Sequence, residues 1–271
     1  MAWSAHGAGG EGGRLAPPGQ AGDFLALLRA SGRDWPPQVL GGGAAGASQL
    51  AAHATTVLAL KHRDGIVVAG DRRATAGTTV VYDRADKVLQ LDEFSVLGIA
   101  GVPAFASEIA RILEHSFKYF RRSQLQELSV EGKLRSLSNL LRDQLPLLLQ
   151  GVGLVAPLFA CWERGQGGRL YFYDPLGARF EGASYAASGS GGTIIQSILL
   201  YRTRYEGRRL EELEQPAAIA LALQLLEVAA DTDAATGGVR SRGDIFPLVK
   251  CIGENGVQSV PEAQLRKLLL D

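Results

Sequence analysis

The alternation of strand-forming and helix-forming segments is the feature that most restricts the fold of this chain. Apolar and β-branched runs typical of strands come first, two stretches with helical spacing of apolar residues follow, and the same order then repeats. The segments are strands within 55–100, helices at 102–122 and 129–150, strands within 153–182, helices at 191–205 and 216–233, a hairpin at 244–260 and a short helix up to Asp271. This order predicts an α+β domain in which two antiparallel sheets pack together and helix pairs cover them.

The two helices of the first pair each place apolar side chains on one face. The apolar residues are Ile109, Ile112 and Leu113 in the segment 102–122, and Leu134, Leu137, Leu141 and Leu145 in the segment 129–150. This spacing predicts one helix over each segment, with its apolar face buried in the core of the domain.

The composition of the chain changes sharply near residue 54. The first 54 residues hold 12 of the 34 glycines and four of the 11 prolines, and they contain few strand-forming residues. A segment of this composition folds poorly by itself, so it is either a disordered tail or a propeptide. Two pieces within it have local character: "DFLALLRA" (23–30) favours two helical turns, and "WPPQVL" (35–40) favours an extended apolar patch.

Charge and hydropathy exclude several function classes. With 28 basic and 28 acidic residues, the chain has no net field to attract nucleic acid or an anionic lipid surface. No apolar run is long enough to span a membrane, and no secretory signal is recognisable, so we expect a cytoplasmic protein whose partners are proteins. Cys161 and Cys251 lie in apolar strand-like runs, which indicates core packing. We expect no metal site and no cofactor.

Thr55 opens the first strand, "TTVLALKH", directly after the glycine-rich segment. A threonine hydroxyl is a weak nucleophile unless a base takes its proton, and the α-amine of the same threonine is one base that does so. An α-amine has a pKa near 8, which suits neutral conditions, but it exists here only if the bond between Ala54 and Thr55 is cut. The abrupt start therefore raises the hypothesis that Thr55 is a nucleophile released by cleavage.

Asp71 and Lys87 supply the charged groups that such a nucleophile requires. A lysine near the hydroxyl favours the alkoxide and lowers the pKa of the amine, and a carboxylate holds the lysine in place. Asp71 ends the second strand in "AGDRRAT" and Lys87 opens another in "RADKVLQL". Strands paired in one sheet would bring these two ends together. Each residue taken alone is better explained as a surface charge at a strand end, and only the joint pattern of the two favours a catalytic pair.

Six motifs in this order resemble one known family: "TTVLAL", "AGDRRAT", "DKV", "GIAG", "SGSGG" and "DTDAATGG". They are similar to the catalytic β-subunits of the bacterial 20S proteasome, and the resemblance covers Thr55 to about Val260. It implies the N-terminal nucleophile hydrolase fold, a four-layer αββα sandwich of two antiparallel sheets between helix layers. It also implies that residues 1–54 are a propeptide removed on maturation and that residues 55–271 form the peptidase domain.

The resemblance assigns roles to individual residues. Thr55 would be the nucleophile and, through its amine, the general base, with Asp71 and Lys87 as the supporting pair. The backbone N–H of Gly101 would be an oxyanion donor. Ser190, Asp233 and Thr236 would form a hydroxyl and carboxylate network that orients the amine, with Thr236 standing where many relatives have serine.

Substrate contacts and the cleavage site follow from the same resemblance. Thr75 would pair with the substrate backbone as an added strand. The pocket for the side chain before the cut would be lined by Ala74, Ala85, Ile99 and Pro103. These apolar residues predict a preference for large apolar side chains. Ala54 replaces the glycine that relatives usually have before the threonine, so its Cβ either slows self-cleavage or is tolerated as the next smallest side chain.

The implied function is a threonine endopeptidase, a zymogen that removes its own propeptide and then degrades unfolded proteins processively. It would work as a homo-heptameric β-ring, paired with proteasome α-subunits in a four-ring barrel and served through the α-rings by an ATP-dependent unfoldase ring. Two alternatives stay open. One is a noncatalytic structural ring subunit, which commonly lacks the threonine or the lysine. The other is a subunit of the simpler two-ring ATP-dependent peptidase, which is usually shorter than residues 55–271.

Overall fold

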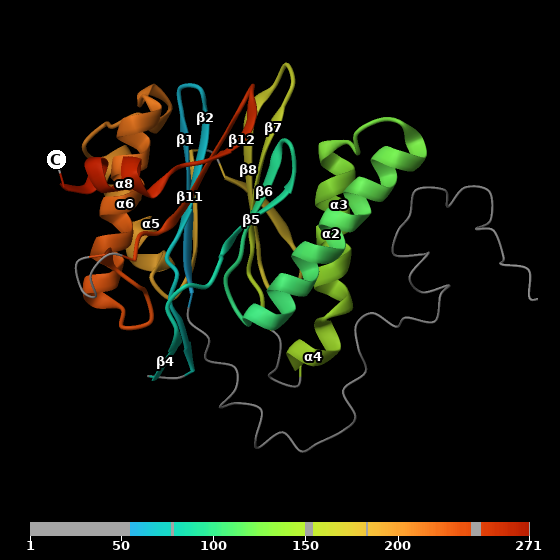
Figure 1. Cartoon of the computed structure of the whole chain (residues 1–271), viewed down its shortest axis with the longest axis horizontal. Helices are drawn as coiled ribbons and strands as arrows, with labels where there is room; N and C mark the ends of the chain where they lie inside the picture. The colour runs from blue at the N-terminus through green and yellow to red at the C-terminus, as the bar shows by residue number, and fades with distance from the viewer. Residues whose placement is uncertain (1–54, 77–78, 150–153, 183, 240–244, 271) are drawn as a thin grey trace, which may run out of the picture.

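The computed structural model describes residues 55–76, 79–149, 154–182, 184–239 and 245–270. The predicted tail segments at 23–30 and 35–40, and Ala54, lie outside the described residues. Within these ranges two five-stranded sheets lie face to face, and helices cover the outer face of each (Figure 1). The predicted α+β sandwich with helix layers outside is confirmed.

The first sheet has the strand order β10-β1-β2-β11-β12, and all of its neighbouring strands are antiparallel. Its strands are β1 (Thr56–His62), β2 (Gly65–Gly70), β10 (Tyr185–Gly189), β11 (Leu248–Gly253) and β12 (Gly256–Ser259). Every residue of β2 is buried, because β2 is a central strand with helices on one face and the second sheet on the other. Burial on both faces explains why "GIVVAG" is a continuous apolar run rather than an alternating one.

The second sheet has the order β5-β6-β7-β8-β9 and is also antiparallel. Its strands are β5 (Val88–Asp92), β6 (Ser95–Gly98), β7 (Leu158–Glu163), β8 (Gly167–Tyr173) and β9 (Arg179–Gly182). A separate two-stranded sheet joins β3 (Ala74–Ala76) to β4 (Thr79–Tyr82).

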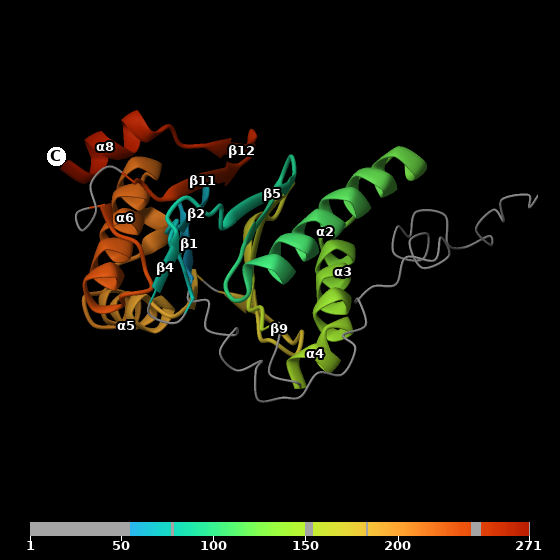
Figure 2. The ribbon, with the colours of Figure 1, turned by 60° about the horizontal axis from the view of Figure 1, so that its bottom comes forward.

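Helices form the outer layers, as both views show (Figures 1 and 2). The first sheet is covered by α5 (Gly192–Arg204), α6 (Gln215–Thr232) and α8 (Glu262–Leu270), with a short 3-10 helix η1 (Leu210–Glu212) between α5 and α6. The second sheet is covered by α2 (Pro103–Gln124) and α3 (Val130–Asp143), and the short helix α4 (Leu145–Leu149) packs against α3. None of the helices in the described ranges is long and apolar enough to cross a membrane.

Side chains of β1 alternate between two cores. Leu58 and Leu60 pack in the cluster beneath α5 and α6, whereas Val57 and Ala59 pack in the cluster between the two sheets. This alternation follows from the two-residue period of a strand. A third cluster joins the second sheet to α2 and α3. The sandwich therefore holds β1 from both sides, which fixes the position of the residue before it, Thr55.

The prediction of a single helix over 129–150 is wrong. The segment divides into α3 and α4 at Gln144. Pro146 explains the break, because proline has no N–H to continue the helical hydrogen bonds and its ring collides with the preceding turn. Leu134 and Leu141 are buried as expected, but Leu145, beyond the break, is exposed.

Candidate active site

Thr55 lies immediately before β1 and is only 4% exposed. Its hydroxyl oxygen accepts a hydrogen bond from the backbone N–H of Gly101, with an N···Oγ1 distance of 2.9 Å. Its carbonyl accepts a second bond from the N–H of Ser190, at 3.2 Å. Both the backbone and the side chain of Thr55 are thus held by residues far away in the sequence.

Gly101 can present its N–H in this way only because it is glycine. Its backbone has φ = 116°, a conformation that residues with side chains rarely adopt. A Cβ at this position would lie 2.0 Å from the carbonyl oxygen of Leu154. Gly101 also forms an isolated antiparallel bridge with Val155, which fixes the loop between β6 and α2 against the segment before β7.

Asp71 and Lys87 form a buried ion pair, with Nζ and Oδ1 2.6 Å apart and side-chain exposures of 2% for Lys87 and 0% for Asp71. The same Oδ1 accepts the backbone N–H of Thr56 at 3.0 Å. Oδ2 accepts the N–H groups of Arg73 and Gly237, each at 2.9 Å. One carboxylate therefore ties the lysine to the residue that follows Thr55.

Burial lowers the pKa of Lys87, and the Asp71 carboxylate beside it opposes this shift. The cost of desolvating an ammonium group is the physical cause. A lysine with a lowered pKa exchanges a proton more readily near neutral pH than an ordinary surface lysine does.

Asp71 and Lys87 lie in contact, but the prediction that strand pairing within one sheet brings them together is wrong. Asp71 follows β2 in the first sheet, and Lys87 precedes β5 in the second. The two residues therefore meet across the face-to-face sandwich and not along one sheet. Their pairing depends on the packing of the two sheets, which strand pairing within one sheet does not explain.

A second network links Ser190, Asp233 and Thr236. The hydroxyls of Ser190 and Thr236 both donate to Oδ2 of Asp233, the latter at 2.6 Å. Asp233 lies at the C-terminal cap of α6, and Ser190 follows β10. All three residues thus meet as predicted at the end of the first sheet where Thr55 lies.

Thr56 belongs to this network, and the sequence analysis missed it. Its hydroxyl lies 2.7 Å from that of Thr236 and accepts the N–H of Gly191 at 3.0 Å. Because the Thr236 hydroxyl donates its proton to Asp233, the Thr56 hydroxyl must donate to Thr236. The result is a chain of hydrogen bonds in which each group donates to the next, from the Gly191 N–H through the hydroxyls of Thr56 and Thr236 to the Asp233 carboxylate.

Arg73 is the second residue that the sequence analysis missed. Its guanidinium Nη1 donates to the carbonyls of Ala234 and Thr236, at 2.8 and 3.0 Å. Its backbone N–H binds Asp71. Arg73 therefore fastens the loop after α6 to the ion pair, and its position two residues after Asp71 in "AGDRRAT" was the available signal.

Comparisons with known proteins identify the family of the chain. The family model described as "Proteasome subunit" matches residues 51–241. The chain belongs to the proteasome subunit family. Among similar proteins are a proteasome subunit beta of Acidimicrobium ferrooxidans, 38% identical over 92% of this chain and 88% of its own length, and one of Jonesia denitrificans, 38% identical over 80% of this chain and 70% of its own. A proteasome subunit beta of Streptomyces griseus is 36% identical over 79% of this chain and 74% of its own.

The residues predicted to contact substrate lie around the same end of the proteasome-type sandwich. Thr75 is buried in β3, which pairs with β4. The N–H of Ala85 donates to the backbone carbonyl of Arg72 at 2.9 Å, and the N–H of Ile99 donates to the backbone carbonyl of Lys87 at 2.8 Å. Pro103 is the first residue of α2, and Ala74 the first of β3. The backbone thus anchors Ala85 and Ile99 to segments that also carry active-site residues.

No group of three or more His, Cys, Asp or Glu side chains within the described ranges is arranged to hold a metal ion. Cys161 and Cys251 are both free and buried, as the prediction of core packing requires. Burial raises the pKa of the Cys161 thiol to about 12, so this thiol is not a nucleophile at neutral pH. The arrangement around Thr55 therefore offers a hydroxyl, a lysine, two carboxylates and backbone N–H donors for chemistry.

Proposed function

We propose that this chain is a threonine-type endopeptidase subunit of a 20S proteasome core, with Thr55 as its nucleophile. The observation that carries the proposal is the Asp71 carboxylate, whose Oδ1 receives both the Lys87 ammonium and the N–H of Thr56. This contact brings a buried cation next to the residue that follows Thr55. A positive charge at that place favours the Thr55 alkoxide over the hydroxyl.

The first reaction is removal of residues 1–54. The Thr55 Oγ attacks the carbonyl carbon of Ala54, the C–N bond between Ala54 and Thr55 breaks, and the hydroxyl proton passes to the departing nitrogen. Water then hydrolyses the resulting ester, which leaves a carboxylate on Ala54 and a free α-amine on Thr55. Residues 1–54 are the propeptide, residues 55–271 are the mature peptidase, and before this step the chain is a zymogen.

The second reaction uses the new amine. It takes the proton from Thr55 Oγ as the oxygen attacks a substrate carbonyl, and then gives it to the leaving amine of the substrate. The acyl ester on Thr55 is hydrolysed by water with the same amine as the base. Ser190, Asp233 and Thr236 orient the amine, and the chain of bonds from Thr56 keeps that network in place.

Gly101 stabilises the charge that forms on the carbonyl oxygen. The Gly101 N–H lies within hydrogen-bonding distance of Thr55 Oγ1, the attacking oxygen. When Oγ1 bonds to a substrate carbonyl carbon, the carbonyl oxygen of the substrate therefore lies close to the same N–H. Removing one such donor typically costs about 10²–10³ in turnover. The positive φ of Gly101, which glycine adopts without a Cβ clash, is the feature that points the N–H towards the reaction.

Substrate enters as an added strand against Thr75, and the side chain before the cut lies among Ala74, Ala85, Ile99 and Pro103. The absence of a carboxylate among these four residues favours large apolar side chains over basic ones. The subunits form homo-heptameric β-rings, which α-subunits complete as a four-ring barrel in the cytoplasm. An ATP-dependent unfoldase ring docks on the α-rings and supplies unfolded protein.

Intact-mass measurement of the assembled particle, together with peptide hydrolysis, tests this proposal. The native chain is expected to lose residues 1–54 and to hydrolyse peptides, whereas Thr55→Ala keeps its full mass and is inactive. Thr55→Ser is expected to retain part of both activities, because it keeps a hydroxyl. Thr203→Ala serves as the matched control, since among the described residues the Thr203 hydroxyl donates to carbonyls of its own helix, α5.

The outcomes also separate the alternatives. A native chain that assembles at full length without activity would identify a noncatalytic ring subunit. Activity from two rings of this chain alone, without α-subunits, would identify the simpler two-ring peptidase. Processing of Thr55→Ala at the usual position would contradict the role of Thr55.

A further inference from the structure

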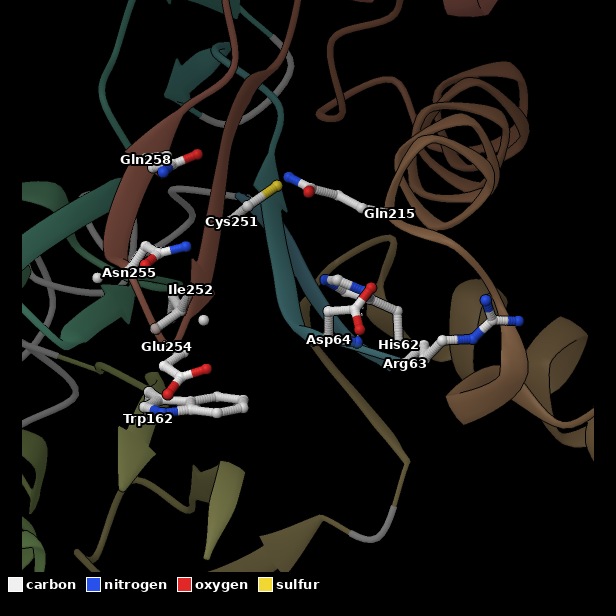
Figure 3. Close-up of a pocket in the computed structure, with 12 residues that line it drawn as sticks. His62, Arg63, Asp64, Trp162, Gln215, Cys251, Ile252, Glu254, Asn255 and Gln258 are labelled. Carbon is white, nitrogen blue, oxygen red and sulfur yellow. Dashed lines mark hydrogen bonds between the residues drawn. The ribbon is translucent and has the colours of Figure 1, made fainter. Parts of the chain in front are cut away.

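A cavity of about 300 Å³ lies at the end of β1 opposite to Thr55. Because β1 has seven residues, this cavity is roughly 20 Å from the candidate active site. It lies between the β1–β2 turn and the β11–β12 turn, with Trp162 at the end of β7 on one side and Gln215 at the start of α6 on another (Figure 3). Its volume is at the lower end of the range for small-ligand pockets, about 300–1,000 Å³.

Two glycines bring the turns together. Gly65 and Gly253 are register partners, and a Cβ on Gly65 would lie 2.0 Å from the carbonyl oxygen of Ile252. Continuing this antiparallel register places Asp64 opposite Glu254. Both carboxylates line the cavity, and both residues are exposed. Neither has an ion-pair partner among the residues that the structure describes.

The cationic residue that lines the cavity does not neutralise these carboxylates. Arg63 donates to Glu214 at 3.3 Å and to the carbonyl of Glu212 at 3.2 Å, so its guanidinium is turned towards η1 and α6. Figure 3 shows this side chain pointing away from Trp162. His62 adds no positive charge at neutral pH, because burial lowers the pKa of its imidazole. The side chains that line the cavity therefore carry a net negative charge at neutral pH.

The remaining walls suit a flat cation. Trp162 offers an indole surface, and in Figure 3 the Glu254 carboxylate lies beside it. Aromatic faces attract cations, and an indole does so most strongly. Amide oxygens are available from Gln215, Asn255 and Gln258. A metal ion is a poor match, because no three metal-ligating side chains gather closely enough within the described ranges.

We propose that this cavity binds a guanidinium group, which stacks on Trp162 and forms hydrogen bonds with the carboxylates of Asp64 and Glu254. A guanidinium is preferred over an ammonium because it is planar, stacks on aromatic rings and donates in pairs to carboxylates. Two sources share this chemistry: a free small guanidinium compound, and the arginine side chain of a bound protein. The site is independent of the chemistry at Thr55.

Calorimetric titration of the full-length protein with 1-butylguanidinium tests the proposal. Saturable binding with one site per chain is expected. The double variant Asp64→Asn/Glu254→Gln is expected to raise the Kd for butylguanidinium at least about tenfold, because a tenfold change corresponds to the loss of one modest charge-assisted hydrogen bond. These substitutions lie on exposed turns, so the fold is retained. Trp162→Leu is expected to weaken binding as well, and Glu262→Gln, an exposed carboxylate on α8, is the matched control.

A second titration, with a blocked Gly-Arg-Gly peptide, distinguishes the two sources. Comparable affinity for the peptide, lost in the double variant, would assign the site to an arginine side chain. Binding of butylguanidinium alone would assign it to a free small molecule. The proposal is overturned if butylguanidinium shows no saturable binding to the native chain, or if it binds the double variant as tightly as it binds the control.

Discussion

Exchanging Asp71 for Asn should destabilise the protein more than exchanging its partner Lys87 for Met. The two residues form one ion pair, but their surroundings differ. Asp71 accepts three backbone N–H groups besides the lysine, from Thr56, Arg73 and Gly237. For Lys87, the contact with Asp71 is the single side-chain hydrogen bond found within the described residues.

The magnitudes follow from what each substitution leaves behind. Lys87→Met removes one charge-assisted hydrogen bond, worth about 1.5–3 kcal/mol, while the carboxylate keeps its three backbone donors. Asp71→Asn leaves a buried ammonium without its partner. The NH₂ group of the new asparagine would also replace one carboxylate oxygen, so that a donor would face backbone N–H groups that need an acceptor. Breaking a buried pair in this way costs about 3–5 kcal/mol. A difference of about 2 kcal/mol moves the urea midpoint by about 1 M.

Urea unfolding followed by circular dichroism measures this difference. Both substitutions should be made in the Thr55→Ala background, so that cleavage of the tail does not change the molecule under study. Lys118→Met is the matched control, because Lys118 forms an exposed helical pair with Glu114 and its side chain is 53% exposed. Its effect should stay within about 0.5 kcal/mol. A loss from Lys87→Met equal to or larger than that from Asp71→Asn would refute the reasoning.

Three further predictions concern other parts of the molecule. Gly101→Ala should lower turnover about 10²-fold and the free energy of unfolding by about 1–3 kcal/mol, because the added Cβ would lie 2.0 Å from the Leu154 carbonyl oxygen. Peptide hydrolysis measures the first effect and thermal unfolding the second. Thr236→Ser should retain activity, whereas Thr236→Val should lose at least about tenfold in kcat, because the link from Thr56 to Asp233 is broken. Burial lowers the pKa of His62 from its ordinary value of 6.5, so on acidification the unfolded chain takes up a proton at this residue before the folded chain does. The free energy of unfolding should therefore decrease as the pH falls below 6.5. Measured at pH 7.5 and 5.5, this decrease should be smaller in His62→Gln than in the native chain.

Each of these predictions has an outcome that contradicts it. Normal turnover and stability in Gly101→Ala would show that the loop accepts a side chain. Equal kcat values for the serine and valine variants of Thr236 would remove the hydroxyl chain from the mechanism. An unchanged pH dependence in His62→Gln would show that other groups set the acid sensitivity.

The layers of the fold were predictable because local patterns determine them. Continuous apolar runs such as "GIVVAG" indicate strands covered on both faces, and helical spacing of Leu134, Leu137 and Leu141 indicates a helix packed on a sheet. The break before α4 was predictable in principle from Pro146, but the apolar spacing around it outweighed that signal. The α+β sandwich is therefore a consequence of periodicity, while one helix boundary depends on a single residue.

The candidate site was predictable only in part. The short motifs locate Thr55, Asp71 and Lys87, but they do not show that the last two meet across two sheets. The motifs do not single out Thr56, because its partner Thr236 is 180 positions away in the sequence. Arg73 likewise reaches carbonyls of a loop 161 positions away. Contacts of this kind depend on tertiary packing: the motif "AGDRRAT" draws attention to Arg73, but it does not show which carbonyls the side chain reaches.

The hydrogen bonds around Thr55 have a consequence for how such a peptidase is controlled. They are present in a chain of 271 residues, in which the Thr55 nitrogen is still an amide bonded to Ala54. Under the proposed mechanism, the described contacts of Thr55 are therefore already in place when cleavage changes its nitrogen from an amide to an amine. An enzyme built this way is switched on once, by chemistry and not by shape, and no later conformational change can return it to the inactive form. Its safety must come from when and where that single bond is cut.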